Sequence, residues 1–161
     1  MKKLAFAAAR TPLAGAVVRF GFAHVRRLLP LRVVEQGERV AVYEHPRPVY
    51  GTYHHIAVPS VGVPDVVALA GPAHTDVRAE LVEILARRGD TALVNAGPRQ
   101  DVGQVHFHLT DDAQAGREAH AEWPGWEAAI SGFAALPDLP RWIAGGVTLL
   151  QRPGDPRVHL V

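Results

Sequence analysis

Two histidines that share one face of a predicted strand are the residues of this chain best suited to chemistry. They end the run Gln100-Asp-Val-Gly-Gln-Val-His106-Phe-His108, which predicts a strand over residues 102–110. Because successive side chains of a strand point to opposite faces, both imidazoles lie on the same face. That face also takes Gln100, Val102 and Gln104, and the other face takes Val105, Phe107 and Leu109. The run therefore predicts a chemical site of imidazoles and amides, backed by core residues.

Three interpretations of the two histidines are open at this point. One is a solvent-exposed polar sheet face with no functional role, although such faces usually carry Lys, Glu or Thr. A second is a metal site for zinc or iron, completed by His45, His54 or His55; the nearby Asp101 is predicted on the opposite face, which disfavours it. A third is covalent or general-base catalysis, with one imidazole as nucleophile or base and the other as its helper.

The run resembles the signature of the histidine triad (HIT) superfamily of nucleotide hydrolases and transferases, in which a glutamine, a valine and three histidines alternate with other residues. Gln100, Val102, His106 and His108 match this pattern without a gap. Gln104 stands where the family has its first histidine.

Three upstream segments are similar to other parts of the family pattern, in the family's order. Asn95-Ala-Gly97 resembles its Asn-x-Gly, and the strand of residues 54–59 resembles its His-x-Leu-Val-Ile-Pro. Residues 43–48, Tyr-Glu-His-Pro-Arg-Pro, resemble its Phe-x-Asp-x-x-Pro turn. The resemblance covers about residues 31–112 and is weighed as an analogy.

The resemblance implies a chemical role for each matched residue. His106 would attack the α-phosphorus of a nucleotide and form a transient phosphohistidine, which water or another acceptor resolves. His108 would donate to a phosphate oxygen, while Gln100 and Asn95 would position the phosphate or the leaving group. Gln104 cannot take up a proton, so we expect it to orient its neighbours and the turnover to be reduced.

Two further histidines fall on family positions near the nucleoside. His45 stands where many members bind the ribose hydroxyls with Asp; imidazole lacks the bidentate acceptor of a carboxylate, so the preferred nucleoside is left open. His54 falls on a family histidine, for which a structural and a catalytic role are equally open.

The function implied is that of a HIT-type hydrolase or nucleotidyl transferase without a cofactor, acting on a nucleoside phosphoramidate, a dinucleoside polyphosphate or a similar nucleotide. One alternative is a nucleotide-binding protein with weak or no catalysis, and a second is a metal-dependent enzyme using the His-x-His strand. The resemblance favours a homodimer, and we expect a cytoplasmic protein.

Composition sets broader limits. With 161 residues and 48% apolar content, the chain predicts a single core with extensions. A net charge of +1 gives no general basic surface, so nucleic acid is not indicated as a partner. The lack of cysteine excludes disulfides and the structural zinc that some HIT branches carry.

Residues 1–30 are predicted to form an N-terminal extension with an amphipathic, basic helix. It begins at Thr11-Pro12, a favourable helix start, and runs to about Leu29. The start of the chain is similar to a signal peptide, but Arg10 ends its apolar run early, so we expect it to be uncleaved. The helix packs on the domain or across a dimer, or else docks on an anionic membrane surface.

The fold class predicted for residues 31–112 is α+β: an antiparallel sheet of about five strands with one main packing helix. Strands are predicted over residues 32–35, 39–44, 55–58, 91–95 and 102–110, and one or two helical turns over residues 65–70. The main helix is capped by Thr75 or Asp76 and ends at Gly89. Its buried stripe comprises Val77, Leu81, Ile84 and Leu85, and its solvent face Arg78, Glu80, Glu83 and Arg87.

Residues 113–161 are predicted to be a C-terminal extension that packs on the same domain. A turn at residues 122–126 leads to a short helix through Phe133, which residues 137–140 break. Residues 147–151 and 158–160 predict a terminal hairpin. Trp123, Trp126 and Trp142 are interpreted as core or interface anchors, with a wall of a base pocket as the alternative.

Overall fold

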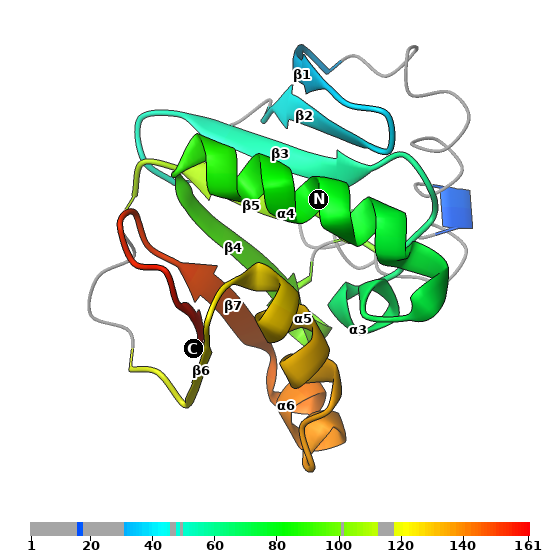
Figure 1. The fold of residues 1–161 in the computed structure, drawn as a ribbon, viewed down its shortest axis with the longest axis vertical. Helices are drawn as coiled ribbons and strands as arrows, with labels where there is room; N and C mark the ends of the chain where they lie inside the picture. The colour runs from blue at the N-terminus through cyan, green and yellow to red at the C-terminus, as the bar shows by residue number, and fades with distance from the viewer. Residues whose placement is uncertain (1–15, 18–30, 46–47, 49, 101, 113–117) are drawn as a thin grey trace, which may run out of the picture.

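The computed structural model describes residues 16–17, 31–45, 48, 50–100, 102–112 and 118–161. The helix predicted over residues 11–29 lies outside this part of the chain, apart from Ala16 and Val17, which are helical. The described residues form an eight-stranded sheet with helices packed on it (Figure 1). No helix in this part of the chain combines the length and the apolarity needed to cross a membrane.

The strands pair antiparallel in the order β1-β2-β3-β5-β4-β7-β8-β6. Their bounds are β1 Val33–Gln36, β2 Val40–Glu44, β3 His54–Pro59, β4 Thr91–Ala96, β5 Phe107–Thr110, β6 Ala121–Trp123, β7 Val147–Gln151 and β8 Val158–Leu160. The α+β class and the terminal hairpin are confirmed. The predicted number of about five strands is wrong, because the sheet has eight. The hairpin joins the same sheet because β7 pairs with β4, and β6 then pairs with β8.

Two helices cover one face of this sheet (Figure 1). They are α4 (Thr75–Arg88) and α5 (Trp126–Ala134), while α3 (Val66–Leu69) and the 3₁₀ turn η2 (Pro72–His74) precede α4. A second 3₁₀ turn, η3 (Gly97–Arg99), follows β4, and α6 (Leu139–Gly145) packs against it. The sequence did not predict α6, because Pro140 was interpreted as a breaker although proline is compatible with a first helical turn.

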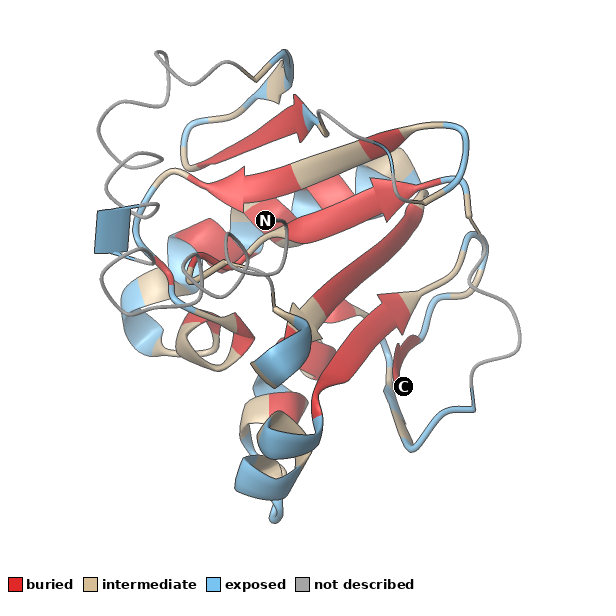
Figure 2. Ribbon diagram, turned by 180° about the vertical axis from the view of Figure 1, so that it is seen from behind, coloured by how far each residue is buried: buried red, intermediate tan, exposed pale blue. Residues whose placement is uncertain are grey.

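The buried apolar side chains of the strands belong to three separate clusters. Phe107 and Leu109 of β5 belong to the large apolar cluster that includes the buried residues of α4 and α5. Leu93, Leu150 and Val161 form a separate cluster. Figure 2 views the sheet from behind and shows how much of each strand is buried. The predicted alternation between His108 and its apolar neighbours is therefore confirmed.

The strand predicted over residues 102–110 begins only at Phe107. Residues 102–106 instead follow an irregular path, in which Val105 donates its backbone N–H to the carbonyl of Val63 at 2.7 Å. The side chain of Gln104 is fully buried and bonds the backbone of residues 59–63. Because these contacts are made to a loop, residues 102–106 do not extend β5.

The main helix differs from its prediction at two points. Its N-cap is His74, which makes no side-chain capping bond, rather than Thr75 or Asp76. Arg78 is buried, not on the solvent face, because α3 and α5 pack over it. Its guanidinium donates to the carbonyl of Leu69 at 2.9 Å and to Glu127 of α5 at 2.8 Å.

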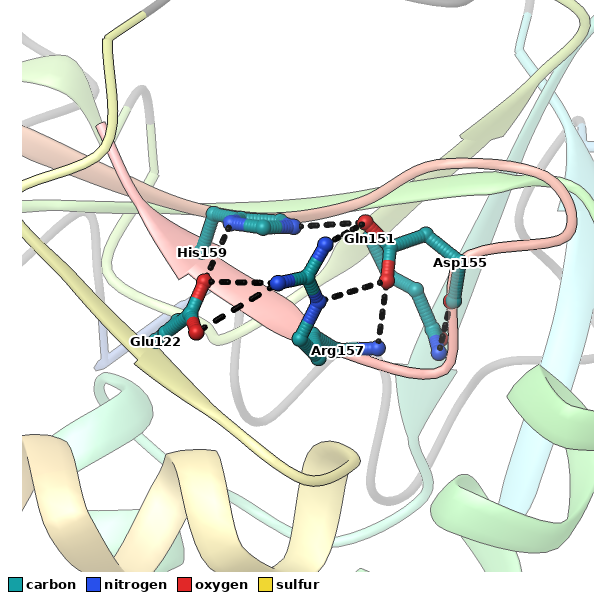
Figure 3. Close-up of polar contacts among 5 residues, drawn as sticks. All are labelled: Glu122, Gln151, Asp155, Arg157 and His159. Atoms are coloured by element: carbon teal, nitrogen blue, oxygen red, sulfur yellow. Dashed lines mark hydrogen bonds and ion pairs between the residues drawn. The ribbon is translucent and has the colours of Figure 1, made fainter.

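An ionic cluster joins the terminal hairpin to β6 (Figure 3). Asp155 accepts hydrogen bonds from the backbone N–H and side chain of Arg157, and lies 2.9 Å from Nε2 of His159. These hydrogen bonds hold the pKa of Asp155 below its ordinary range. Glu122 of β6 binds Arg157 at 3.3 Å, so the cluster connects strands that are distant in sequence.

Candidate active site

Four imidazoles gather on the side of the sheet where His108 points. His45 follows β2, His54 begins β3, His106 immediately precedes β5, and His108 lies in β5. The rings of His45 and His54 stack with centroids 4.2 Å apart, His54 and His108 are 4.9 Å apart, and His106 and His108 are 4.8 Å apart. The structure therefore brings together four of the seven predicted site residues.

The two most buried of these imidazoles are hydrogen-bonded to each other. Nε2 of His54 lies 2.7 Å from Nδ1 of His108, and the side chains are almost fully buried. Burial, followed by the neighbouring histidines, lowers the pKa of His54 to about 4 and holds the pKa of His108 well below its ordinary value. Both rings are therefore neutral near pH 7, and one donates the proton that the other accepts.

His106 is half-buried, and a backbone contact fixes its tautomer. Its Nδ1 lies 3.0 Å from the carbonyl oxygen of Gln104. Because a carbonyl only accepts hydrogen bonds, Nδ1 carries the proton, and Nε2 of the neutral ring carries the lone pair. An imidazole held in this way is a competent nucleophile through Nε2.

The side chain of Gln104 does not take part in this contact. Its Oε1 accepts the N–H of Val63 at 3.2 Å, and its Nε2 donates to the carbonyls of Val61 and Pro59 at 3.1 and 3.4 Å. Gln104 thus fixes the loop beside the histidines, and its backbone supports His106. These contacts favour a positioning role for Gln104, because its side-chain amide is bonded to the loop within the described residues.

Asn95 and Gln100 lie near the turn that joins β4 to the histidine run. Oδ1 of Asn95 accepts a hydrogen bond from Thr148 at 2.8 Å, which leaves its amide nitrogen as the donating side. Nε2 of Gln100 donates to the carbonyls of Pro64 and Val102 at 2.6 and 2.7 Å. Within the described residues, the hydrogen bonds of Gln100 shape the turn and do not join it to the imidazoles.

Tyr50 is a site neighbour that the sequence did not reveal. Its ring meets the rings of His54 and His108 edge-on, with centroids 5.2 and 5.6 Å apart. Tyr50 lies four residues before the His54 strand, and its sequence position alone gave no signal. These contacts place an aromatic ring beside the two hydrogen-bonded imidazoles.

The metal interpretation receives no support from the grouping of side chains. In the part of the chain that the structure describes, no three His, Cys, Asp or Glu residues are grouped so that they could hold a metal ion. His55 is not part of the imidazole group, because its Nδ1 accepts a hydrogen bond from the guanidinium of Arg88 at 2.8 Å.

No family model and no curated protein matches this sequence. Among solved structures, a HIT family hydrolase from Clostridium thermocellum is similar, with 19% identity and a TM-score of 0.47 over 60% of this chain and 92% of that one. A HIT family hydrolase from Legionella pneumophila has 18% identity and a TM-score of 0.45, covering 64% and 95%. A histidine triad protein from Clostridium difficile has 19% identity and a TM-score of 0.44, covering 66% and 93%. At sequence identities below 20% and TM-scores below 0.5, this similarity is not used to infer an activity.

Proposed function

We propose that this chain is a HIT-type nucleotide hydrolase or nucleotidyl transferase that acts at the α-phosphate through a covalent intermediate on His106. The observation that carries the proposal is the contact between Nδ1 of His106 and the backbone carbonyl of Gln104, at 3.0 Å. It places the proton on Nδ1 and leaves the lone pair on Nε2, as covalent catalysis by a neutral imidazole requires.

In the proposed first step, Nε2 of His106 attacks the α-phosphorus. A P–N bond forms, and the bond to the leaving group breaks with its electron pair, which solvent protonates. The ring becomes cationic, and the carbonyl of Gln104 then accepts a stronger, charge-assisted hydrogen bond from Nδ1. In the second step water attacks the phosphorus, the P–N bond breaks with its electron pair returning to Nε2, and the water gives up a proton to solvent. The nucleoside monophosphate then leaves, and His106 is neutral again.

The neighbouring side chains fit the stabilisation of charge on the phosphate. In the tautomer in which His54 donates to Nδ1 of His108, the second nitrogen of His108 carries a proton and can donate to a phosphate oxygen. The amide nitrogen of Asn95 can donate in the same way. His45, stacked on His54, is placed to bond a nucleoside hydroxyl.

Replacement of the first family histidine by Gln104 does not remove the acceptor that His106 needs, because that acceptor is a backbone oxygen. This favours a catalytic protein over the alternative of a nucleotide-binding protein without turnover. A homodimer remains part of the proposal by resemblance alone.

The test is hydrolysis of an adenosine phosphoramidate, adenosine phosphosulfate and a dinucleoside polyphosphate by the full chain. We expect turnover of at least one substrate and a loss of about a hundredfold or more in His106→Ala, the scale of losing a covalent catalyst. His74→Ala, on the helix side of the sheet, is the matched histidine control and should retain the rate. Nucleotide binding without turnover of any substrate would overturn the catalytic proposal and leave the binding protein.

A further inference from the structure

The two residues that flank His54, Tyr53 and His55, belong to a hydrogen-bond network outside the imidazole group. His54 begins β3, and the alternation of side chains along a strand directs His55 to the opposite face of the sheet. The ring of Tyr53 lies beside the ring of His55, with centroids 5.1 Å apart and a tilt of 35°. The residues on both sides of His54 therefore contact each other on the side of the strand away from its imidazole.

Asp90 and Arg88 connect this pair of rings to the end of α4. The hydroxyl of Tyr53 donates to Oδ1 of Asp90, and Oδ2 of Asp90 accepts from Nε of Arg88 at 2.7 Å. The guanidinium of Arg88 also donates to Nδ1 of His55 at 2.8 Å. Asp90 lies between Gly89, the C-cap of α4, and the first residue of β4, so the network joins the start of β3 to this turn.

The protonation states of the two rings match this network near neutral pH. Burial, followed by the hydrogen bond to Asp90, raises the pKa of Tyr53 to about 12, so the phenol stays protonated and donates. Burial, followed by the charge of Arg88, lowers the pKa of His55, so its Nδ1 keeps the lone pair that accepts. The side chains of Arg88 and Asp90 are only 18% and 13% exposed, which limits the screening of their ion pair by salt.

A second carboxylate fixes the same segment from the end of β5. Asp111 accepts hydrogen bonds from the hydroxyl of Thr52 and from its backbone N–H, the latter at 2.7 Å. A Cβ atom at Gly51 would collide with this carboxylate, so glycine allows the close approach. Because β5 also carries His108, Asp111 connects the segment before β3 to the strand of the histidine that His54 bonds.

We propose that Tyr53 and Asp90 are positioning residues of the candidate active site, which act through His54. The pairing of β3 with β5 ends at His54, opposite Thr110, so side-chain contacts anchor the residue before it. The contact of Tyr53 with Asp90 thus fixes the backbone where β3 begins, and with it the direction of the His54 imidazole toward His108. In one respect the inference rests on the proposed function: a misplaced His54 should slow phosphate transfer and leave nucleotide binding intact.

The first test is an NMR titration of the His54 imidazole in the full chain, which needs no substrate. Burial holds the pKa of His54 at about 4 in the wild type. Tyr53→Phe removes only the hydroxyl, and Asp90→Ala removes its acceptor. Both should raise the pKa of His54 toward its ordinary value, because a loosened imidazole gains contact with water. Asp90→Asn keeps an oxygen that can accept from Tyr53 and should stay closer to the wild type.

Arg78→Ala is the control for a general loss of stability, since Arg78 bonds residues of α3 and α5. It should leave the pKa of His54 at the wild-type value. An unchanged pKa of His54 in either Tyr53→Phe or Asp90→Ala, or an equal rise in Arg78→Ala, overturns the inference.

Kinetic measurements test the part that rests on the proposed function. We expect Tyr53→Phe to lower kcat about tenfold, the scale of a small misplacement of a positioned group, with KM within about twofold of the wild type. An unchanged kcat, or a rise in KM in its place, would contradict this part. If the wild type hydrolyses no nucleotide, the proposed function fails, while the titration still decides whether Tyr53 and Asp90 position His54.

Discussion

The Nε2 atom of His54 lies 2.7 Å from the Nδ1 atom of His108, across two paired strands of the sheet. The register of β3 and β5 places His108 opposite Ile56, so the two imidazoles are offset diagonally and meet through their ring edges. This contact fixes the orientation of His108 beside His106. Because both rings are buried and neutral, the loss of one ring removes a buried hydrogen bond from the other.

Substitution of His54 should therefore impair His108. We expect His54→Ala to lower kcat at least tenfold and His54→Gln to recover part of the loss, because an amide nitrogen can still donate to Nδ1. The measurement is kcat and KM for the best nucleotide substrate. If alanine and glutamine have equal effects on kcat, His54 acts through packing and not as a hydrogen-bond partner.

Stability should fall as the pH is lowered below about 6.5. The pKa values of His54 and His108 lie below their ordinary 6.5 in the folded chain, so the unfolded chain binds protons that the folded chain does not. Their contribution is complete above pH 6.5 and is lost as the pH falls toward about 4, the pKa of His54. Between pH 6.5 and 5.5 each imidazole should remove about 1 kcal/mol from the free energy of unfolding.

Urea unfolding at a series of pH values measures this loss. The double variant His54→Gln and His108→Gln should have a shallower pH dependence than the wild type, whatever its stability at neutral pH. Parallel curves for the two proteins would show that other groups cause the dependence.

Gln104 should matter for stability more than for the chemical step. Gln104→Ala leaves the buried N–H of Val63 without its side-chain acceptor and should cost about 1–3 kcal/mol of unfolding free energy. The control is Gln36→Ala, an exposed glutamine that donates to a neighbouring carbonyl, with an expected change within about 0.5 kcal/mol. Urea midpoints of the two variants give the comparison.

Gln104→His should not accelerate catalysis, because the acceptor for Nδ1 of His106 is the backbone carbonyl in either protein. Single-turnover rates of the wild type and the variant provide the measurement. A large gain in rate would mean that glutamine limits the chemistry, contrary to the role inferred from the structure.

Arg78 should stabilise the packing of α3, α4 and α5. Arg78→Ala leaves the buried carbonyl of Leu69 and the carboxylate of Glu127 without this partner, and should cost about 3 kcal/mol. Arg87→Ala, on the exposed side of the same helix, should change stability by less than about 1 kcal/mol. Similar losses in thermal unfolding for the two variants would contradict the assignment of Arg78 to the interior.

The sequence predicted the parts of the fold that depend on local periodicity. The buried stripe of α4, including Leu81 and Leu85, follows helical spacing, and Gly89 ends the helix in the left-handed conformation. Contacts between segments that are distant in sequence could not be predicted from local periodicity. Arg78 has the spacing of an exposed residue, and only the packing of α5 with Glu127 buries it.

The candidate site was predictable in its residue types but not in all of its contacts. Alternation along β5 placed His108 opposite the core, and the strand of His54 was predicted from its apolar residues. The inward turn of Gln104 was not predictable, because its partners lie in the loop of residues 59–63 and interrupt the strand pattern. The backbone contact of His106 depends on that same irregular path.

The central claim is that Nε2 of His106 becomes covalently bound to the α-phosphate of a nucleotide. Rapid quenching of the wild-type chain with substrate under alkaline conditions, followed by mass spectrometry of its peptides, measures this directly. We expect one acid-labile nucleotidyl group, located on His106 and absent from His106→Ala. An adduct on another residue, or turnover without any adduct under conditions that preserve phosphohistidine, would contradict the account.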